Sequence, residues 1–122
     1  SDAKKAVELG ADAIMISNHG GRQLDGSRSP FDQLEEIVQA VGGDLDIILD
    51  GGIQRGTHIL KAMALGATAC SGGRMYLYAL AAAGRAGVEK ALGNLHTEIE
   101  RDMKLMGIRS LRDLHPGMIR QH

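Results

Sequence analysis

The chain has 122 residues, of which 43% are hydrophobic, but it holds one Phe, two Tyr and no Trp. This composition favours helices packed on strands over an aromatic-rich β-sandwich. The formal net charge is −1 and both signs are mixed along the sequence, so no nucleic-acid or polyanion surface is indicated. A single cysteine, Cys70, excludes an internal disulfide and a cysteine-type zinc site, and it suits a reducing compartment.

The first part of the sequence predicts a helix, a strand and a second helix. Two good helix-capping residues, Ser1 and Asp2, precede a short helix over residues 3–9. The apolar run Ala13–Ile16 is too short for a helix and suits a buried strand. A glycine-rich polar loop (18–30) then leads into a helix that ends at a glycine pair, with apolar positions Leu34, Ile37, Val38 and Val41.

The second part repeats the strand and helix pattern. Residues 47–49 and 67–71 predict two more strands, with a helix over residues 57–65 between them. Helices then fill most of residues 75–106, and a short helix or turn with a tail follows over 110–122. The long helical region carries an apolar stripe of Val88, Ala91, Leu92, Leu95, Ile99, Met103 and Met106.

The order of these elements is α-βα-βα-βα without an internal domain boundary. Apolar strands that alternate with helices predict an α/β fold with a parallel sheet covered by helices. The pattern alone fits both a doubly wound sheet and a barrel.

Glycine-rich polar sequence follows each predicted strand, at residues 17–26, 50–56 and 72–74. In parallel α/β folds, chemistry gathers at the carboxyl ends of the strands. In the first of these loops, His19 can accept a proton near neutral pH, and Arg22 can bind a carboxylate through two parallel hydrogen bonds. The alternative is a solvated turn with an incidental histidine.

The glycine pairs of the other two loops indicate a phosphate site. Gly51 and Gly52 precede a predicted helix start, which offers bare N–H groups and a positive dipole end. Gly73 and Arg74 provide a second helix start with a cation beside it. Each pair alone could form an ordinary turn, but two adjacent helix starts form the phosphate site of a (β/α)8 barrel.

Taken together, these motifs resemble those of the FMN-dependent 2-hydroxy-acid dehydrogenases and oxidases. That family includes glycolate oxidase, L-lactate dehydrogenase and (S)-mandelate dehydrogenase. The resemblance rests on SNHGGRQLD at residues 17–25, on Asp50-Gly51-Gly52 and on Gly73-Arg74, and it extends over nearly the whole chain. It implies that residues 1–122 are the C-terminal portion, the last three βα units, of a (β/α)8 TIM barrel.

The resemblance also implies FMN-dependent oxidation of a small (S)-2-hydroxy acid to the 2-oxo acid. It makes His19 the general base and Arg22 the residue that binds the substrate carboxylate. The proton passes to His19 and two electrons pass to the flavin, as a hydride or through a carbanion. The positions that match FMN contacts are Ser17, Asp50, Gly51, Gly52, Ile53, Gln54, Gly73 and Arg74.

Two positions depart from the family pattern. Gln54 stands where the family usually has Arg, and the last strand ends in Ala-Cys-Ser-Gly (69–72) where a branched apolar run is usual. Both changes affect the expected FMN affinity more than the role of His19. Further flavin-facing and substrate-facing residues of the family would precede Ser1, and a whole barrel needs about 250 residues. We therefore expect little or no turnover from the isolated chain.

The remaining expectations concern partners and other side chains. We expect a homo-oligomer in the cytoplasm without a membrane segment in this stretch or a nucleic-acid partner, and peripheral membrane association stays open. His96 and Glu100 predict an exposed helix pair rather than a metal site. We expect His58 at the surface and Cys70 as a packed strand residue. The alternatives to the flavoenzyme are a non-catalytic βα module stabilised by oligomerisation and another FMN- or phosphate-binding barrel.

Overall fold

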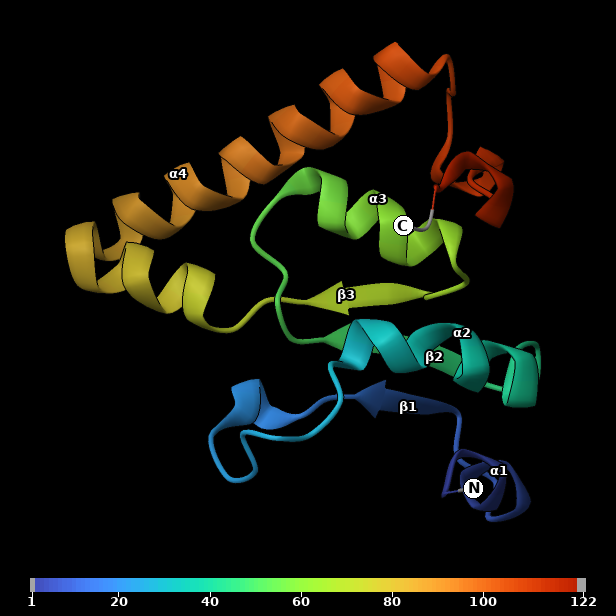
Figure 1. Cartoon of the computed structure of the whole chain (residues 1–122). Helices are drawn as coiled ribbons and strands as arrows, with labels where there is room; N and C mark the ends of the chain where they lie inside the picture. The colour runs from blue at the N-terminus through green and yellow to red at the C-terminus, as the bar shows by residue number, and fades with distance from the viewer. Residues whose placement is uncertain (1, 121–122) are drawn as a thin grey trace.

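A parallel three-stranded sheet forms the centre of residues 2–120, the part of the chain that the computed structural model describes (Figure 1). Its strands are β1 (Ala13–Ile16), β2 (Asp46–Asp50) and β3 (Ala69–Ser71), with β2 in the middle. All three predicted strands are confirmed, and the third begins later than predicted. Thr68 lies in a bend before β3, where its hydroxyl accepts a hydrogen bond from the backbone N–H of Ile47 at 3.1 Å.

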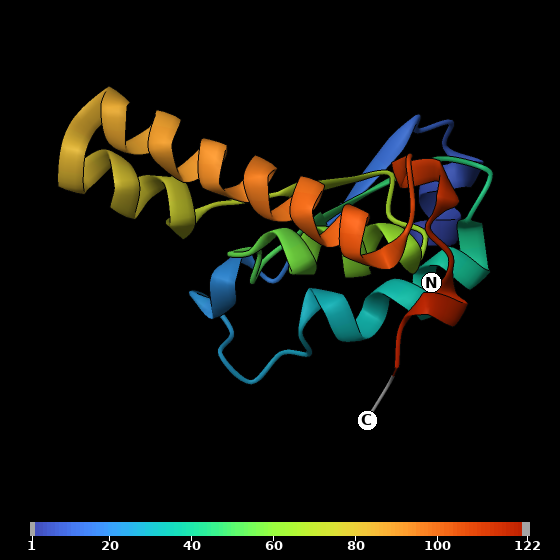
Figure 2. The same cartoon turned by 90° about the horizontal axis from the view of Figure 1, so that it is seen from above.

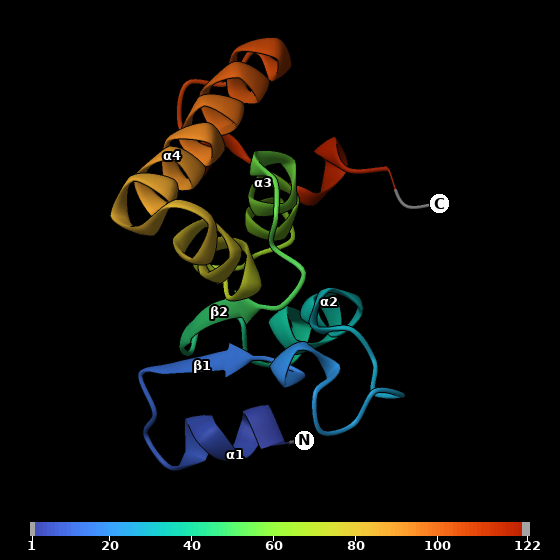
Figure 3. The same cartoon turned by 90° about the vertical axis from the view of Figure 1, so that its left-hand side faces the viewer.

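Three helices precede or connect the strands in the predicted order. They are α1 (Asp2–Glu8), α2 (Pro30–Val41) and α3 (Gly56–Ala64). The α2 helix begins with a proline, and the Ser29 hydroxyl caps it by accepting from the N–H of Asp32 at 3.1 Å. The predicted cap Ser1 lies outside the described residues. Figure 3 shows α2 and α3 on the same side of the sheet.

The hydrophobic core lies between the sheet and these two helices. Ile47 and Leu49 of β2 are 1% and 0% exposed, and Leu34 of α2 is 0% exposed. Burial of a side chain of this size contributes about 1.5–3 kcal/mol to folding. The other members of the core cluster are Ile16, Val41, Ile53, Ala62, Leu65 and Ala67.

The other face of the sheet is uncovered in the described part of the chain. The strand register aligns Met15, Ile48 and Ala69 in one row on this face. Met15 is 55% exposed, although its neighbour in the chain, Ile16, is buried on the opposite face. Within residues 2–120, β1 and β3 are also the unpaired edges of the sheet.

The last helix, α4 (Arg74–Met106), consists of two helical segments that meet at a kink. Ala83 (φ −151°) and Gly84 (φ 57°, ψ −143°) leave helical geometry there. The second segment returns over α3 (Figures 1 and 2). The predicted apolar stripe is only partly correct, because Ile99 is half-buried but Leu92 is 52% exposed.

Two short 3₁₀ turns, Leu111–Asp113 and Pro116–Met118, complete the described chain, as the prediction of a short helix or turn allowed. Among the described helices, none combines the length and apolar composition that crossing a bilayer requires.

Candidate functional site

The carboxyl ends of the strands bring polar side chains to one edge of the sheet. Asp50 pairs with Ser71 in the strand register. The Ser17 hydroxyl donates to Asp50 Oδ2 at 2.6 Å, a length typical of a bond to an ionised oxygen. Two of the predicted flavin contacts, Ser17 and Asp50, are therefore joined directly at this edge.

A tight turn, His19–Gly21, follows β1 and is held by its two preceding side chains. Ser17 Oγ accepts from the N–H of His19, and Asn18 Oδ1 accepts from the N–H of Gly20, both at 3.0 Å. His19 has a φ of 53°, and Gly20 and Gly21 follow with φ values of 67° and 72°. A histidine in this left-handed region costs about 1–3 kcal/mol, and such strain clusters at functional sites.

The side chain of His19 is exposed, and its Nδ1 lies 2.5 Å from Gln23 Oε1. An amide oxygen can only accept, so the contact fits a ring with its hydrogen on Nδ1. In the neutral form of such a ring, Nε2 carries the lone pair that a general base uses.

Arg22 stands three positions after His19 and is also exposed. Within residues 2–120, its guanidinium has no hydrogen-bond or ion-pair partner. A free guanidinium beside the histidine turn is available to a carboxylate ligand.

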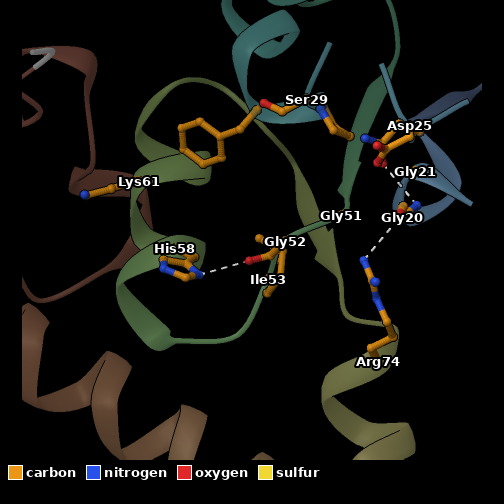
Figure 4. Close-up of a pocket in the computed structure, with 13 residues that line it drawn as sticks. Gly20, Gly21, Asp25, Ser29, Gly51, Gly52, Ile53, His58, Lys61 and Arg74 are labelled. Atoms are coloured by element: carbon orange, nitrogen blue, oxygen red, sulfur yellow. Dashed lines mark hydrogen bonds between the residues drawn. The ribbon is translucent and has the colours of Figure 1, made fainter. Parts of the chain in front are cut away.

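An open pocket of about 520 Å³ lies where the loops after β1 and β2 meet α2 and α3 (Figure 4). This volume is within the range of small-molecule sites. The predicted contact residues that line it are Gly51, Gly52, Ile53 and Arg74. The other predicted site residues do not line this pocket, namely Ser17, His19, Arg22, Asp50, Gln54 and Gly73.

Arg74 connects the start of α4 with the histidine turn. Its Nη2 donates to the carbonyl oxygen of Gly20 at 3.2 Å (Figure 4). A Cβ at Gly20 would lie 2.9 Å from the same nitrogen, so a side chain there would displace the end of Arg74. A Cβ at Gly52 or Gly73 would meet no atom within 4 Å, which leaves open space beside both loops for a ligand.

The start of α3 differs from the prediction of bare N–H groups. The N–H of Gly56 donates to Glu98 Oε2 at 2.7 Å, so a carboxylate of α4 already occupies this helix end. Arg55, which precedes α3, pairs with the same carboxylate, and its Nη2 lies 2.8 Å from Glu98 Oε1. The first N–H group of α3 is therefore not free for a ligand, and the glycines with open space beside them are those at positions 52 and 73.

His58 lies at the surface, as predicted, but it also lines the pocket, which the sequence analysis did not indicate. It is half-buried, and its Nδ1 lies 3.1 Å from the Gly52 oxygen and 3.3 Å from the Gln54 nitrogen. The spacing of a capping box, in which a first-turn side chain returns to the residues before the helix, could have indicated this contact. Lys61 lines the same pocket one turn further along α3.

Two expectations about other side chains are confirmed. His96 Nδ1 lies 3.6 Å from Glu100 Oε1, with the two side chains 75% and 55% exposed. No group of three metal-ligating side chains occurs among residues 2–120. Cys70 packs partly buried against the core, and this burial raises the pKa of its thiol to about 11.

A parallel α/β sheet with a histidine turn and glycine loops at its strand ends defines a class of proteins that bind small ligands at that edge. The family model described as FMN-dependent dehydrogenase matches residues 1–121, and the chain belongs to this family. The cofactor of the family is FMN.

Known relatives agree with this assignment. The chain is 51% identical to an L-lactate oxidase of Nostoc sp., covering 97% of the chain and 32% of the relative. It is also 51% identical to glycolate oxidase 3 of Arabidopsis thaliana, over 93% of the chain and 31% of the relative. A solved mandelate oxidase variant with a monooxide FMN adduct superimposes with a TM-score of 0.88 at 46% identity, covering 94% of this chain and 37% of that one. The chain thus spans about a third of the length of these relatives.

Proposed function

We propose that the chain supplies the part of an FMN-dependent enzyme that oxidises a small (S)-2-hydroxy acid to the 2-oxo acid. The observation that carries this proposal is His19, an exposed imidazole in a strained turn directly after β1, three positions before an unpaired Arg22. The relatives named as oxidases of lactate and glycolate support the substrate class.

The proposal places the three βα units at the end of a (β/α)8 barrel. The parallel order of the strands supports this placement, as does the uncovered sheet face that carries Met15 and Ile48. In a closed barrel this face would be the interior, and the remaining strands would pair with β1 and β3.

The residues at the strand ends fit the polar parts of FMN. Gly51, Gly52, Ile53 and Gln54 offer backbone groups to the ribityl chain, and Gly73 with Arg74 offers an N–H group and a cation to the phosphate. Ser17 and Asp50 stand on the side of the sheet that would face the flavin. When bound, FMN supplies the two-electron acceptor that the reaction requires.

The chain's own residues then perform two tasks. Arg22 binds the substrate carboxylate through two hydrogen bonds and so fixes the position of C2. A hydrogen on carbon is a poor acid, so its removal needs a base at contact distance, and His19 Nε2 has the free lone pair to accept the proton.

Replacement of His19 by Gln in the complete protein tests this proposal. We expect turnover of a 2-hydroxy acid to fall by about 10²–10⁴-fold, because glutamine cannot accept the proton, while flavin absorbance stays unchanged. His96→Gln, on the exposed side of α4, is the matched control and should leave turnover unchanged. Normal turnover of the His19 variant would refute the role of this residue. A colourless, stable oligomer would instead favour a non-catalytic module.

A further inference from the structure

Glu98, in the second segment of α4, holds the start of α3 with both of its carboxylate oxygens. Oε1 lies 2.8 Å from Arg55 Nη2, and Oε2 accepts from the N–H of Gly56 at 2.7 Å. The Glu98 side chain is only 18% exposed, although it lies in a long surface helix. The contact joins residues more than 40 positions apart, and we refer to it as the Glu98 clasp.

The backbones also approach closely at the clasp. A Cβ at Gly56 would lie 2.7 Å from the Cβ of Glu98 and 2.8 Å from the backbone nitrogen of Ile99. Gly56 is buried, so no larger side chain fits without moving α4 as a whole. The packing at Gly56 is thus independent evidence that α4 is fixed on the first residue of α3.

The clasp ends the loop that carries four of the proposed FMN contacts. This loop begins at Gly51 and Gly52, whose φ values of 123° and 75° are those of glycine turns with little intrinsic stiffness. It is tied at the strand side by the pairing of Asp50 with Ser71, and at the helix side by Arg55 and Gly56. His58 and the buried side chain of Ile53 also hold this loop, so loss of the helix-side tie would loosen the loop rather than free it.

The Glu98 clasp also affects which helix N-terminus, that of α3 or that of α4, is open to a phosphate group. The free N–H groups of a helix N-terminus stabilise nearby anions, and at α3 the first of these groups already donates to the Glu98 carboxylate. Beside Gly73, at the start of α4, there is open space, and Arg74 follows as a cation. A second negative charge at α3 would be repelled by Glu98, whereas one at α4 would be attracted.

We propose that Glu98 is a positioning residue for FMN, which fixes the loop from Gly51 to Gln54 and reserves the phosphate for the turn at Gly73 and Arg74. The identity of the ligand rests on the proposed function above. Glu98 does not touch the flavin in this proposal and acts through Arg55 and Gly56.

The test measures the Kd of FMN for the complete apoprotein by quenching of flavin fluorescence. Glu98→Gln keeps the size of the side chain but loses the charge that pairs with Arg55. We expect its Kd to rise about tenfold, the scale on which residues that orient the direct contacts of a bound group act. Glu89→Gln removes the exposed Arg85–Glu89 pair of the same helix and should leave the Kd unchanged.

Arg55→Gln provides a second variant, which removes the ion pair while the bond from Gly56 to Glu98 remains. It should also raise the Kd of FMN. The double variant should have a Kd no higher than that of the single variant that binds FMN more weakly, because both substitutions act on one contact. This variant also keeps the proposal testable if Glu98→Gln does not fold.

Two outcomes would overturn the inference. The first is an unchanged Kd in both variants. The second is a lower melting temperature of the apoprotein with an unchanged Kd, because that result would make the clasp purely structural. A wild-type protein that binds no FMN would refute the proposed function itself, and this failure is distinguishable because the wild type is measured first.

Discussion

His19 combines a backbone conformation that bends the chain after β1 with an imidazole side chain at the candidate site. Its φ of 53° bends the chain back directly after β1, so the imidazole stays beside the end of the strand. The two glycines that follow continue the turn without strain, but a histidine does so at a cost. Since glycine would be favoured by the backbone alone, the presence of an imidazole here is best explained by its chemistry.

The strain at His19 can be measured with two variants. Both His19→Ala and His19→Gly lose the contact with Gln23, so a difference between them reports the backbone alone. We expect the Gly variant to be more stable than the Ala variant by about 1 kcal/mol, because only glycine adopts this φ freely. Urea unfolding of the two proteins checks this value. Equal stabilities would show that the turn is not strained at this position.

Cys70 gives a prediction that depends on pH. Burial raises the pKa of its thiol to about 11, above the value of about 8.5 for a free thiol. The neutral thiol therefore stabilises the fold below pH 8.5, and this contribution is lost as the pH rises toward 11. We expect slow alkylation by iodoacetamide at pH 8 in the folded protein and fast alkylation in urea. Equal rates would contradict a packed thiol.

Among single residues, the sequence identified candidate site residues that belong to a distinctive motif. It missed residues whose role depends on contacts with distant parts of the chain. His19 and Arg22 stand in one short loop, so their spacing was sufficient to single them out. The contact of Glu98 with Gly56 depends on how α4 lies over α3, and the sequence contains no local sign of it. The contact of His58 with Gly52 was missed because helical periodicity does not show that a side chain turns back to its own N-terminus.

The kink of α4 is the feature that matters most at the scale of elements. It lets the first segment leave β3 and the second segment return over α3, where Glu98 meets Gly56. The sequence predicted helices over most of 75–106 but not the position of the bend, because glycines at 84, 87 and 93 are equivalent by composition. Only Gly84 has a positive φ among these three.

The kink can be tested with a matched pair of glycine substitutions. A Cβ at Gly84 or at Gly93 would meet no atom within 4 Å, so the two sites differ in backbone conformation rather than in space. We expect Gly84→Ala to lower stability by more than 1 kcal/mol, and Gly93→Ala to raise it by about 0.4–1 kcal/mol. Denaturant unfolding distinguishes the two. A neutral Gly84 variant would mean that the kink is not needed.

The Glu98 clasp predicts a response to acid at the same scale. The pKa of Glu98 is lowered by the hydrogen bond from Arg55 and next by the N–H of Gly56. A lowered pKa in the folded state stabilises the protein above the unfolded value of about 4.3 and loses this effect as the pH falls through the folded value. We expect the wild type to exceed Glu98→Gln in melting temperature at pH 6 and the gap to close in stronger acid. A gap that does not depend on pH would contradict a charged clasp.

At the scale of the whole molecule, helices cover one face of the sheet in the described chain, and the other face is exposed. The core between β2 and the helices is tightly buried, whereas Met15 on the opposite side is 55% exposed. The parallel direction of the strands followed from short apolar runs separated by helices, so the sequence sufficed for the α/β class, but their order β1-β2-β3 comes from the structure. The closure into a barrel stays a proposal, because three strands do not define a closed sheet.

The open face leads to a prediction about the isolated chain. His19 and Arg22 are both exposed, so water is not excluded from the place where the substrate would bind. We expect the 122-residue chain alone to show little or no turnover of lactate, glycolate or mandelate, even with added FMN. An assay of 2-oxo-acid formation checks this. Measurable oxidation would show that the described strands suffice for catalysis.

The close approach at Gly56 has a consequence for how such sequences can evolve. A side chain at position 56 would collide with the backbone nitrogen of Ile99, and no substitution at position 98 can remove a backbone atom. Glycine at 56 should therefore persist through divergence, and Glu98 should persist more than Arg55, because Glu98 also accepts from the N–H of Gly56. Homologues that have lost one partner of this pair without the other would be expected to carry a compensating shift in the angle between their last two helices.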